Sequence, residues 1–96
     1  MSKLDLTDVD RLWRTNARSL TTDSQGRETL IGLTFEESVW YLDYEKRRSS
    51  GELRRGPQDV RRRDHDQHEA LRMRHEQCRM QIVSAENEAR LDTQRH

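Results

Sequence analysis

One long helix-forming stretch constrains the fold of this chain more than any other feature. From Gln58 to Leu91 the sequence contains neither glycine nor proline. The stretch is rich in arginine, glutamine, glutamate, alanine, methionine and leucine, which are strong helix formers. Pro57 precedes it, and proline suits the first turn of a helix because no backbone amide donor is needed there. The sequence therefore predicts one long helix over residues 58–91.

A shorter helix is expected near the beginning of the chain. Leu6, Val9 and Trp13 recur at the spacing of one helical face. Asp5 or Thr7 can cap the helix start, because the side-chain oxygen of either residue can accept a free amide proton of the first turn. These features predict a helix over residues 6–18.

The segment that follows has the composition of a hairpin. Asp23 and Gly26 stand at the first and last positions of a four-residue turn, where a type I turn prefers Asp and Gly. Gly26 can also supply the positive φ that closes a bulged hairpin. Short strands are therefore predicted at residues 19–23 and 27–31, and the alternative interpretation is an irregular loop.

A second helix is expected after Thr34. Glu37 follows Thr34 by three residues, which is the pattern of a capping box, in which each side chain accepts the backbone amide proton of the other residue. Gly51 stands where a helix C-terminus favours glycine. The sequence predicts a helix over residues 35–49.

The aromatic residues indicate where the core should lie. All five precede residue 45 in the sequence. The predicted helix 35–49 is apolar on several sides, which is typical of a buried helix. We therefore expect Trp40 and Leu42 to be among the most buried residues, with Trp13 packed against this helix.

Together these patterns predict a mainly α fold with three helices and a short β-hairpin. Residues 1–50 should form a compact core and residues 51–57 a linker. Residues 58–96 should form a long helix, either within the same domain or as an association arm. Apolar residues make up 30% of the chain and charged residues 38%, against about 45–50% and about 25% in typical globular proteins. A core this small favours completion by oligomerisation.

The long helix carries a heptad-like stripe. Its residues, separated alternately by four and three positions, are Leu71, His75, Cys78, Ile82, Ala85 and Ala89. We expect a second copy to pack along this stripe as in a coiled coil, which would make the protein a homo-oligomer, most simply a homodimer. Met73, Met80 and Leu91 lie near the opposite side, so the helix is expected to contact two neighbours, for example its own second helix and another copy. The alternative is that the helix packs only on its own chain.

Three residues of the long helix are candidate metal ligands. His68, His75 and Cys78 share a broad face, and imidazole and thiolate are zinc ligands. One helix would have to supply all of them, however, and a second copy would have to complete the shell. We therefore assign no metal and no cofactor, and keep these residues only as candidates. Cys78 is also a candidate reactive thiol, although a lone cysteine on an apolar stripe more often serves in packing.

Basic residues cluster around the linker. Residues 45–63 hold eight basic and three acidic residues, although the whole chain has 18 of each. The arginines of this cluster are Arg47, Arg48, Arg54, Arg55, Arg61, Arg62 and Arg63. Because guanidinium groups match phosphate geometry, a nucleic-acid-binding regulator that uses residues 46–63 is the alternative function. The other interpretation is that these arginines face acidic residues or water.

Several function classes are not indicated. We find no catalytic triad pattern, phosphate loop or paired-carboxylate site, and we expect no enzymatic activity. The single cysteine cannot form an intrachain disulfide, and no apolar run approaches the ~20 residues of a membrane span. We expect a cytoplasmic protein without membrane contact. The leading hypothesis is a small regulatory protein that self-associates through its long helix and binds a protein partner of unknown identity.

Overall fold

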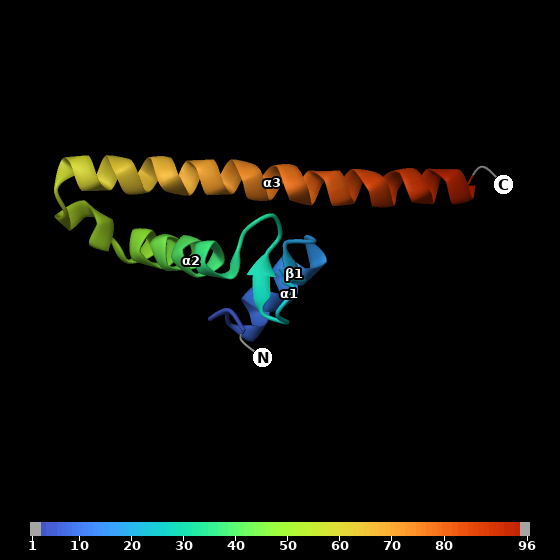
Figure 1. Cartoon of the computed structure of the whole chain (residues 1–96), viewed down its shortest axis with the longest axis horizontal. Coiled ribbons are helices and arrows are strands. Elements are labelled where there is room, and N and C mark those ends of the chain that lie inside the picture. Colours follow the sequence, from blue (N-terminus) through green and yellow to red (C-terminus); the bar gives the residue numbers. More distant parts are fainter. Residues whose placement is uncertain (1–2, 95–96) are drawn as a thin grey trace.

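The computed structural model describes residues 3–94 and is mainly helical (Figure 1). Its elements are α1 (Asp8–Asn16), β1 (Leu20–Thr22), β2 (Glu28–Leu30), α2 (Phe35–Ser50), the 3-10 helix η1 (Glu52–Arg55) and α3 (Gln58–Gln94). The expected fold class is confirmed, since residues 3–94 form three α-helices and one short hairpin. The predicted helix limits agree with the observed ones within a few residues at each end.

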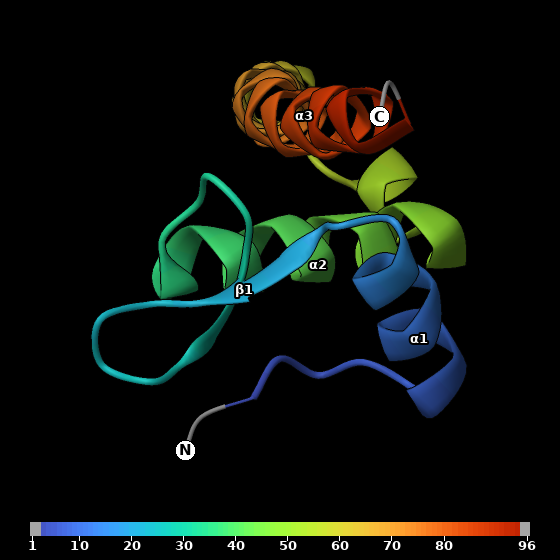
Figure 2. The same cartoon turned by 90° about the vertical axis from the view of Figure 1, so that its right-hand side faces the viewer.

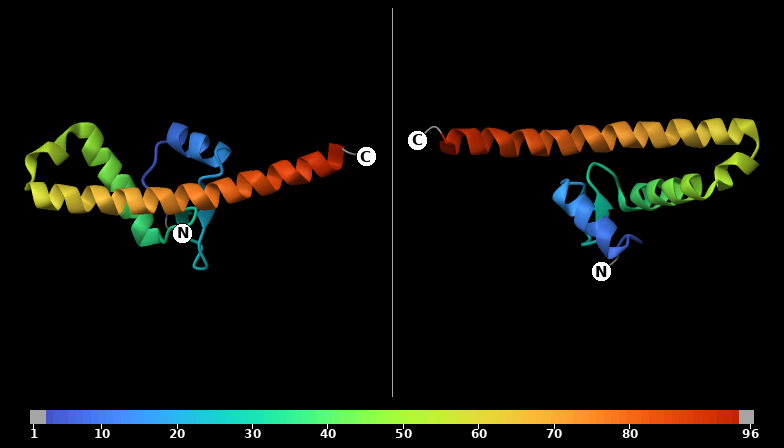
Figure 3. Two further views of the ribbon diagram at one scale, coloured as in Figure 1. Left: turned by 90° about the horizontal axis from the view of Figure 1, so that it is seen from above. Right: turned by 180° about the vertical axis from the view of Figure 1, so that it is seen from behind.

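The long helix α3 forms a layer of its own. After the turn at η1 it runs back over α2, and its C-terminal part extends beyond the rest of the molecule (Figures 1 and 3). Viewed end-on, α1, the hairpin and α2 all lie on one side of α3 (Figure 2). The molecule is therefore elongated, with extents of 59 × 28 × 25 Å. None of the helices in residues 3–94 combines the length and hydropathy needed to cross a membrane.

The hairpin forms as the sequence predicts. β1 and β2 pair antiparallel, with Leu20 opposite Leu30. The Gly26 amide donates to the Asp23 carbonyl over 3.0 Å, and Gly26 has a φ of +77°. The Asp23 carboxylate accepts the backbone amides of Gln25 and Arg27. Asp and Gly therefore close this turn for the reasons that predicted it.

Both ends of α2 also follow the prediction. The Thr34 hydroxyl accepts the Glu37 amide proton over 3.1 Å, and the Glu37 carboxylate accepts the Thr34 amide proton over 2.9 Å. This is a complete capping box. At the other end Gly51 adopts a φ of +83° and its amide donates to carbonyls of the last helical turn. Residues at both ends of α2 therefore form the caps that the local sequence predicts.

The buried core draws on the N-terminal segment, β2 and the loop after it, α2 and α3, but not on α1. Its members are Leu4, Leu30, Leu33, Tyr41 and Leu71. A fully buried hydroxyl links β2 to α2, because Ser38 accepts the Leu30 amide proton over 2.9 Å and donates to the Thr34 carbonyl over 2.8 Å. Ser38 therefore satisfies a buried backbone amide that would otherwise be costly to leave unpaired.

The prediction of the most buried residues is wrong for all three residues that it named. Trp40 and Leu42 are only partly buried, at the edge of the core, and Trp40 stacks on Tyr44 with ring centroids 5.4 Å apart. Trp13 does not pack against α2, since it is 71% exposed. The tyrosines of α2, rather than its tryptophan, face α3.

The orientation of α1 explains the exposure of Trp13. The inner face of α1 carries Arg11, which donates to the Glu28 carboxylate over 3.0 Å and to the Leu4 carbonyl over 2.8 Å. Arg14 donates to Glu45 of α2 over 3.3 Å. The Arg11 guanidinium holds the pKa of the half-buried Glu28 carboxyl below its usual range. Charged pairs thus attach α1 to the core, and its apolar face is left outside.

Candidate functional site

The inner face of α3 is attached to α2 by stacked rings. The imidazole of His68 lies 4.5 Å from the ring of Tyr41 and 4.7 Å from the ring of Tyr44, centroid to centroid. The two interplanar angles are 18° and 25°. Burial raises the pKa of Tyr41 to about 12, and the neighbouring Glu45 carboxylate adds to this shift. These three side chains form a stacked aromatic contact between α2 and α3.

His68 is buried without a hydrogen bond. It is 2% exposed, and neither ring nitrogen has a hydrogen-bond partner among the described residues. The Glu45 carboxylate is 3.7 Å from Nε2, too far for a hydrogen bond. Burial lowers the pKa of His68 from its ordinary value of 6.5, although Glu45 opposes the shift. The folded chain therefore favours neutral His68.

A second histidine connects α3 to the loop after β2. His75 Nδ1 lies 2.7 Å from the Ile31 carbonyl oxygen, so this nitrogen carries the proton and donates it. Next to this contact, Gly32 lies against Cys78 with a φ of +81°. A Cβ atom added to Gly32 would lie 2.7 Å from the Cys78 Sγ atom. The absence of a side chain at Gly32 therefore allows the loop to approach α3.

These contacts bury the first part of the predicted self-association stripe. Leu71 and His75 are 6% and 4% exposed, and both are covered by their own chain. Cys78 and Ile82 are half-buried, whereas Ala85 and Ala89 are exposed. Packing on the chain's own core, the alternative interpretation of the long helix, therefore describes the first part of this stripe. Two of its members are not available to a second copy.

The candidate metal ligands are not brought together. His68 lies between tyrosines, His75 bonds a carbonyl and Cys78 faces Gly32. No group of three or more potential ligand residues capable of holding a metal ion occurs in the described part of the chain. The arginines next to Cys78 are also engaged, with Arg74 paired to Glu37 and Arg79 paired to Glu76. The expectation of no metal stays a prediction, and no observation tests Cys78 as a reactive thiol.

The opposite face of α3 is an uncharged seam, which we call the outer seam. It consists of Ala70, Met73, Gln77, Met80, Ser84, Asn87 and Leu91, and all seven residues are exposed. They are separated alternately by three and four positions, the spacing of a coiled-coil interface. Met73 is 65% exposed and Leu91 55%. In the sequence, Met73, Met80 and Leu91 indicated this second apolar side. Self-association was nevertheless predicted on the stripe that begins at Leu71, part of which packs on the core.

The outer side of α1 is a second exposed apolar surface, which we call the α1 face. Val9, Leu12 and Trp13 are 64%, 61% and 71% exposed. They lie at positions i, i+3 and i+4, the spacing of helices that dock into grooves. Nothing in residues 3–94 covers this face. The sequence pattern predicts the opposite orientation, because amphipathic helices usually bury their apolar side.

The predicted arginine cluster gathers where α2, η1 and α3 meet. Arg47 of this cluster pairs with Asp43 over 3.0 Å. The other six members make no ion pair with any described residue: Arg48, Arg54, Arg55, Arg61, Arg62 and Arg63.

Comparisons of the chain with family models, curated proteins and solved structures each find no significant match. What these surfaces bind is therefore inferred from their own geometry.

Proposed function

We propose that this protein is a non-enzymatic interaction protein that forms a dimer along the outer seam. The observation behind this proposal is the excess of exposed surface. The chain exposes 7346 Å², whereas a compact monomer of its mass would expose about 5,800 Å². Its radius of gyration is 16.1 Å, against about 12.5 Å for a compact domain of this length.

A second copy is the occupant that the surface area favours. A stable dimer buries about 800 Å² of each partner, which is less than the excess of about 1,500 Å² estimated from the mass. A two-fold interface also needs only one self-complementary patch. The outer seam is such a patch, because it is continuous, exposed and uncharged on a helix that is otherwise densely charged.

The composition of the outer seam suits a moderately stable coiled coil. Met73 and Met80 supply apolar bulk, and methionine adapts to irregular packing. Gln77 and Asn87 are polar residues at interface positions, which weaken a coiled coil while specifying its register. Ala70 is small and lets the helix backbones approach closely.

We further propose that the α1 face binds a protein partner. An exposed apolar helix face docks into an apolar groove. Asp8 and Asp10 stand exposed in the first turn of α1 beside this face. Charge complementarity therefore favours a groove with basic residues at its rim. The arginines on the inner side of α1 hold the helix in place, so the face is presented without ordering a new segment.

Charge placed on the outer seam tests the dimer. Met73→Glu with Met80→Glu would place desolvated carboxylates in the interface, so sedimentation equilibrium should show a monomer with an unchanged helical circular dichroism spectrum. Gln67→Glu with Ala85→Glu is the matched control, because both residues are exposed on α3 away from the outer seam. The control should keep the mass of the wild type. Equal masses for both variants would reject the outer seam as the interface.

The α1 face is tested by comparing partners bound by two variants. Leu12→Ala with Trp13→Ala should abolish capture of a host protein that the wild type retains, and Val39→Ala, at a 46% exposed position on α2, should not. The captured protein must then bind the purified wild-type chain directly and fail to bind the α1 variant. If purified partner binds both equally, or if the α1 variant instead alters the oligomer mass, this assignment is wrong.

A further inference from the structure

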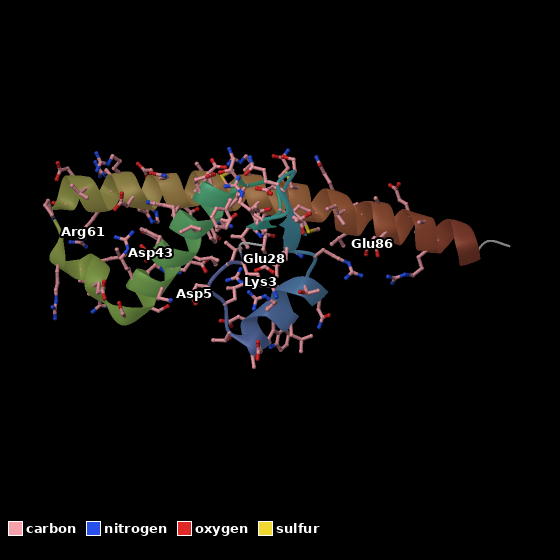
Figure 4. All side chains as sticks on the ribbon, turned by 60° about the horizontal axis from the view of Figure 1, so that its bottom comes forward. Lys3, Asp5, Glu28, Asp43, Arg61 and Glu86 are labelled. Atoms are coloured by element: carbon pink, nitrogen blue, oxygen red, sulfur yellow. The ribbon has the colours of Figure 1, made fainter. Side chains whose placement is uncertain are left out.

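A groove opens at the end of the molecule where the chain turns from α2 into α3. Its volume is about 440 Å³, within the range of about 300–1,000 Å³ that is common for ligand sites. Tyr44 and Leu53 contribute apolar surface, while Arg48, Arg54, Arg61 and Arg62 contribute guanidinium groups. Figure 4 shows Arg61 at this end of the molecule, far from Glu86 on the other part of α3. Three elements, α2, η1 and α3, thus bring basic side chains into one concave site.

The lack of ion-pair partners distinguishes these arginines from most other arginines of the fold. Most arginines elsewhere are paired with carboxylates, for example Arg11 with Glu28 and Arg18 with Glu86, each over 3.0 Å. The four groove arginines are all exposed and make no ion pair with the described residues. Pairing is therefore the rule around the core, and the groove is an exception to it.

The acidic residues near the groove do not remove this excess of positive charge. Asp64 and Asp66 also line it, together with His65 and Gln58. Neither aspartate pairs with a groove arginine, and the arginines outnumber them two to one. The first turn of α3 lies here as well, and a helix start carries partial positive charge. The site therefore favours an anion.

We infer that this groove binds the phosphate backbone of a nucleic-acid strand. Guanidinium groups bind phosphate oxygens through paired hydrogen bonds. Arg55 and Arg63 extend the unpaired positive charge beyond the groove, so the basic surface is larger than a single phosphate needs. A strand with successive phosphates matches such an extended surface. This site is formed by one chain and does not depend on the proposed dimer.

The inference is tested by fluorescence anisotropy with a labelled mixed-sequence single strand of about 20 nucleotides, enough to span a typical binding site. The groove variant is Arg61→Gln with Arg62→Gln. The matched control is Arg72→Gln with Arg90→Gln, which removes the same charge from α3 outside the groove. All three chains should give the same circular dichroism spectrum and the same sedimentation mass, because the substituted side chains are exposed.

The groove variant should bind about tenfold more weakly than the wild type near 100 mM salt, and its slope of log affinity against log salt should flatten by about 1.4. The control should keep the affinity within about threefold and the slope nearly unchanged. Equal losses in both variants would show binding by overall charge and overturn the assignment. Salt-insensitive or absent binding by the wild type would do the same. If inorganic phosphate or a mononucleotide displaced the strand and bound with the same affinity as the strand, the choice of a strand as the ligand would be overturned.

Discussion

His68 of α3 and Tyr41 of α2 stack with ring centroids 4.5 Å apart, although the imidazole has no hydrogen-bond partner among the described residues. A neutral imidazole is an aromatic ring that packs well in such a place. A charged one would have to lose its hydration without gaining a hydrogen bond. This contact therefore makes the packing of α3 on α2 sensitive to protonation.

The first prediction is that the fold loses stability as the pH falls below about 6.5. The pKa of His68 is lowered in the folded chain, so its contribution is fully present above the unfolded value and is lost as the pH falls through the folded value. The ionisable groups that face it are Tyr41, Tyr44, Glu45 and Arg48 from α2 and Glu69 from α3. Thermal melts at about pH 7.5 and about pH 5.5 should differ in the wild type and much less in His68→Phe.

The exposed His65 provides the control for this experiment. His65→Gln should keep the full pH dependence of the wild type, because His65 is exposed on α3. The carboxylates with lowered pKa values, such as Glu28, titrate below this pH window. An unchanged pH dependence in His68→Phe would show that another group carries it.

The second prediction concerns Gly32, where an added side chain has two costs in stability. One is the positive φ of the backbone, and the other is the close contact with Cys78. Gly26 and Gly32 both have positive φ, but a Cβ at Gly26 would meet nothing within 4 Å, whereas one at Gly32 would meet Cys78. Gly26→Ala should therefore cost about 1–2 kcal/mol from the backbone alone. Gly32→Ala should cost more in urea unfolding, and adding Cys78→Ala should recover part of the difference. If Gly32→Ala costs no more than Gly26→Ala, the close contact between the loop and α3 is not as described.

The third prediction compares a buried aromatic residue, Tyr41, with an exposed one, Trp13. Tyr41→Ala should destabilise the fold by about 3–5 kcal/mol, because it removes a buried ring and leaves a cavity. Trp13→Ala should change the unfolding free energy by no more than about 0.5 kcal/mol, as exposed positions do. Urea titration of both variants checks this. A large loss in Trp13→Ala would mean that the α1 face is covered within the folded protein.

Local sequence patterns predicted the elements of the fold well. The capping box at Thr34, the turn from Asp23 to Gly26 and the absence of breakers after Pro57 each act within a few residues, so their outcome does not depend on the rest of the molecule. Helix and hairpin boundaries followed from them.

The packing faces were predicted less well, because they depend on pairs far apart in the sequence. The ion pair of Arg11 with Glu28 directs the charged side of α1 towards the core, so that Trp13 on its apolar side is exposed. The stacking of His68 on Tyr41 directs the inner stripe of α3, which includes Leu71, towards its own core. Periodicity reveals that a helix has two candidate faces, but it does not show which one a distant residue will cover.

The most direct test of this account is the mass of the wild-type chain in solution. If the outer seam joins two copies, sedimentation equilibrium at high micromolar concentration should give twice the chain mass of 11.5 kDa, with dissociation on dilution because polar residues weaken the seam. A mass of 11.5 kDa across the whole concentration range would contradict the account. The outer seam would then be a solvated face of a monomer.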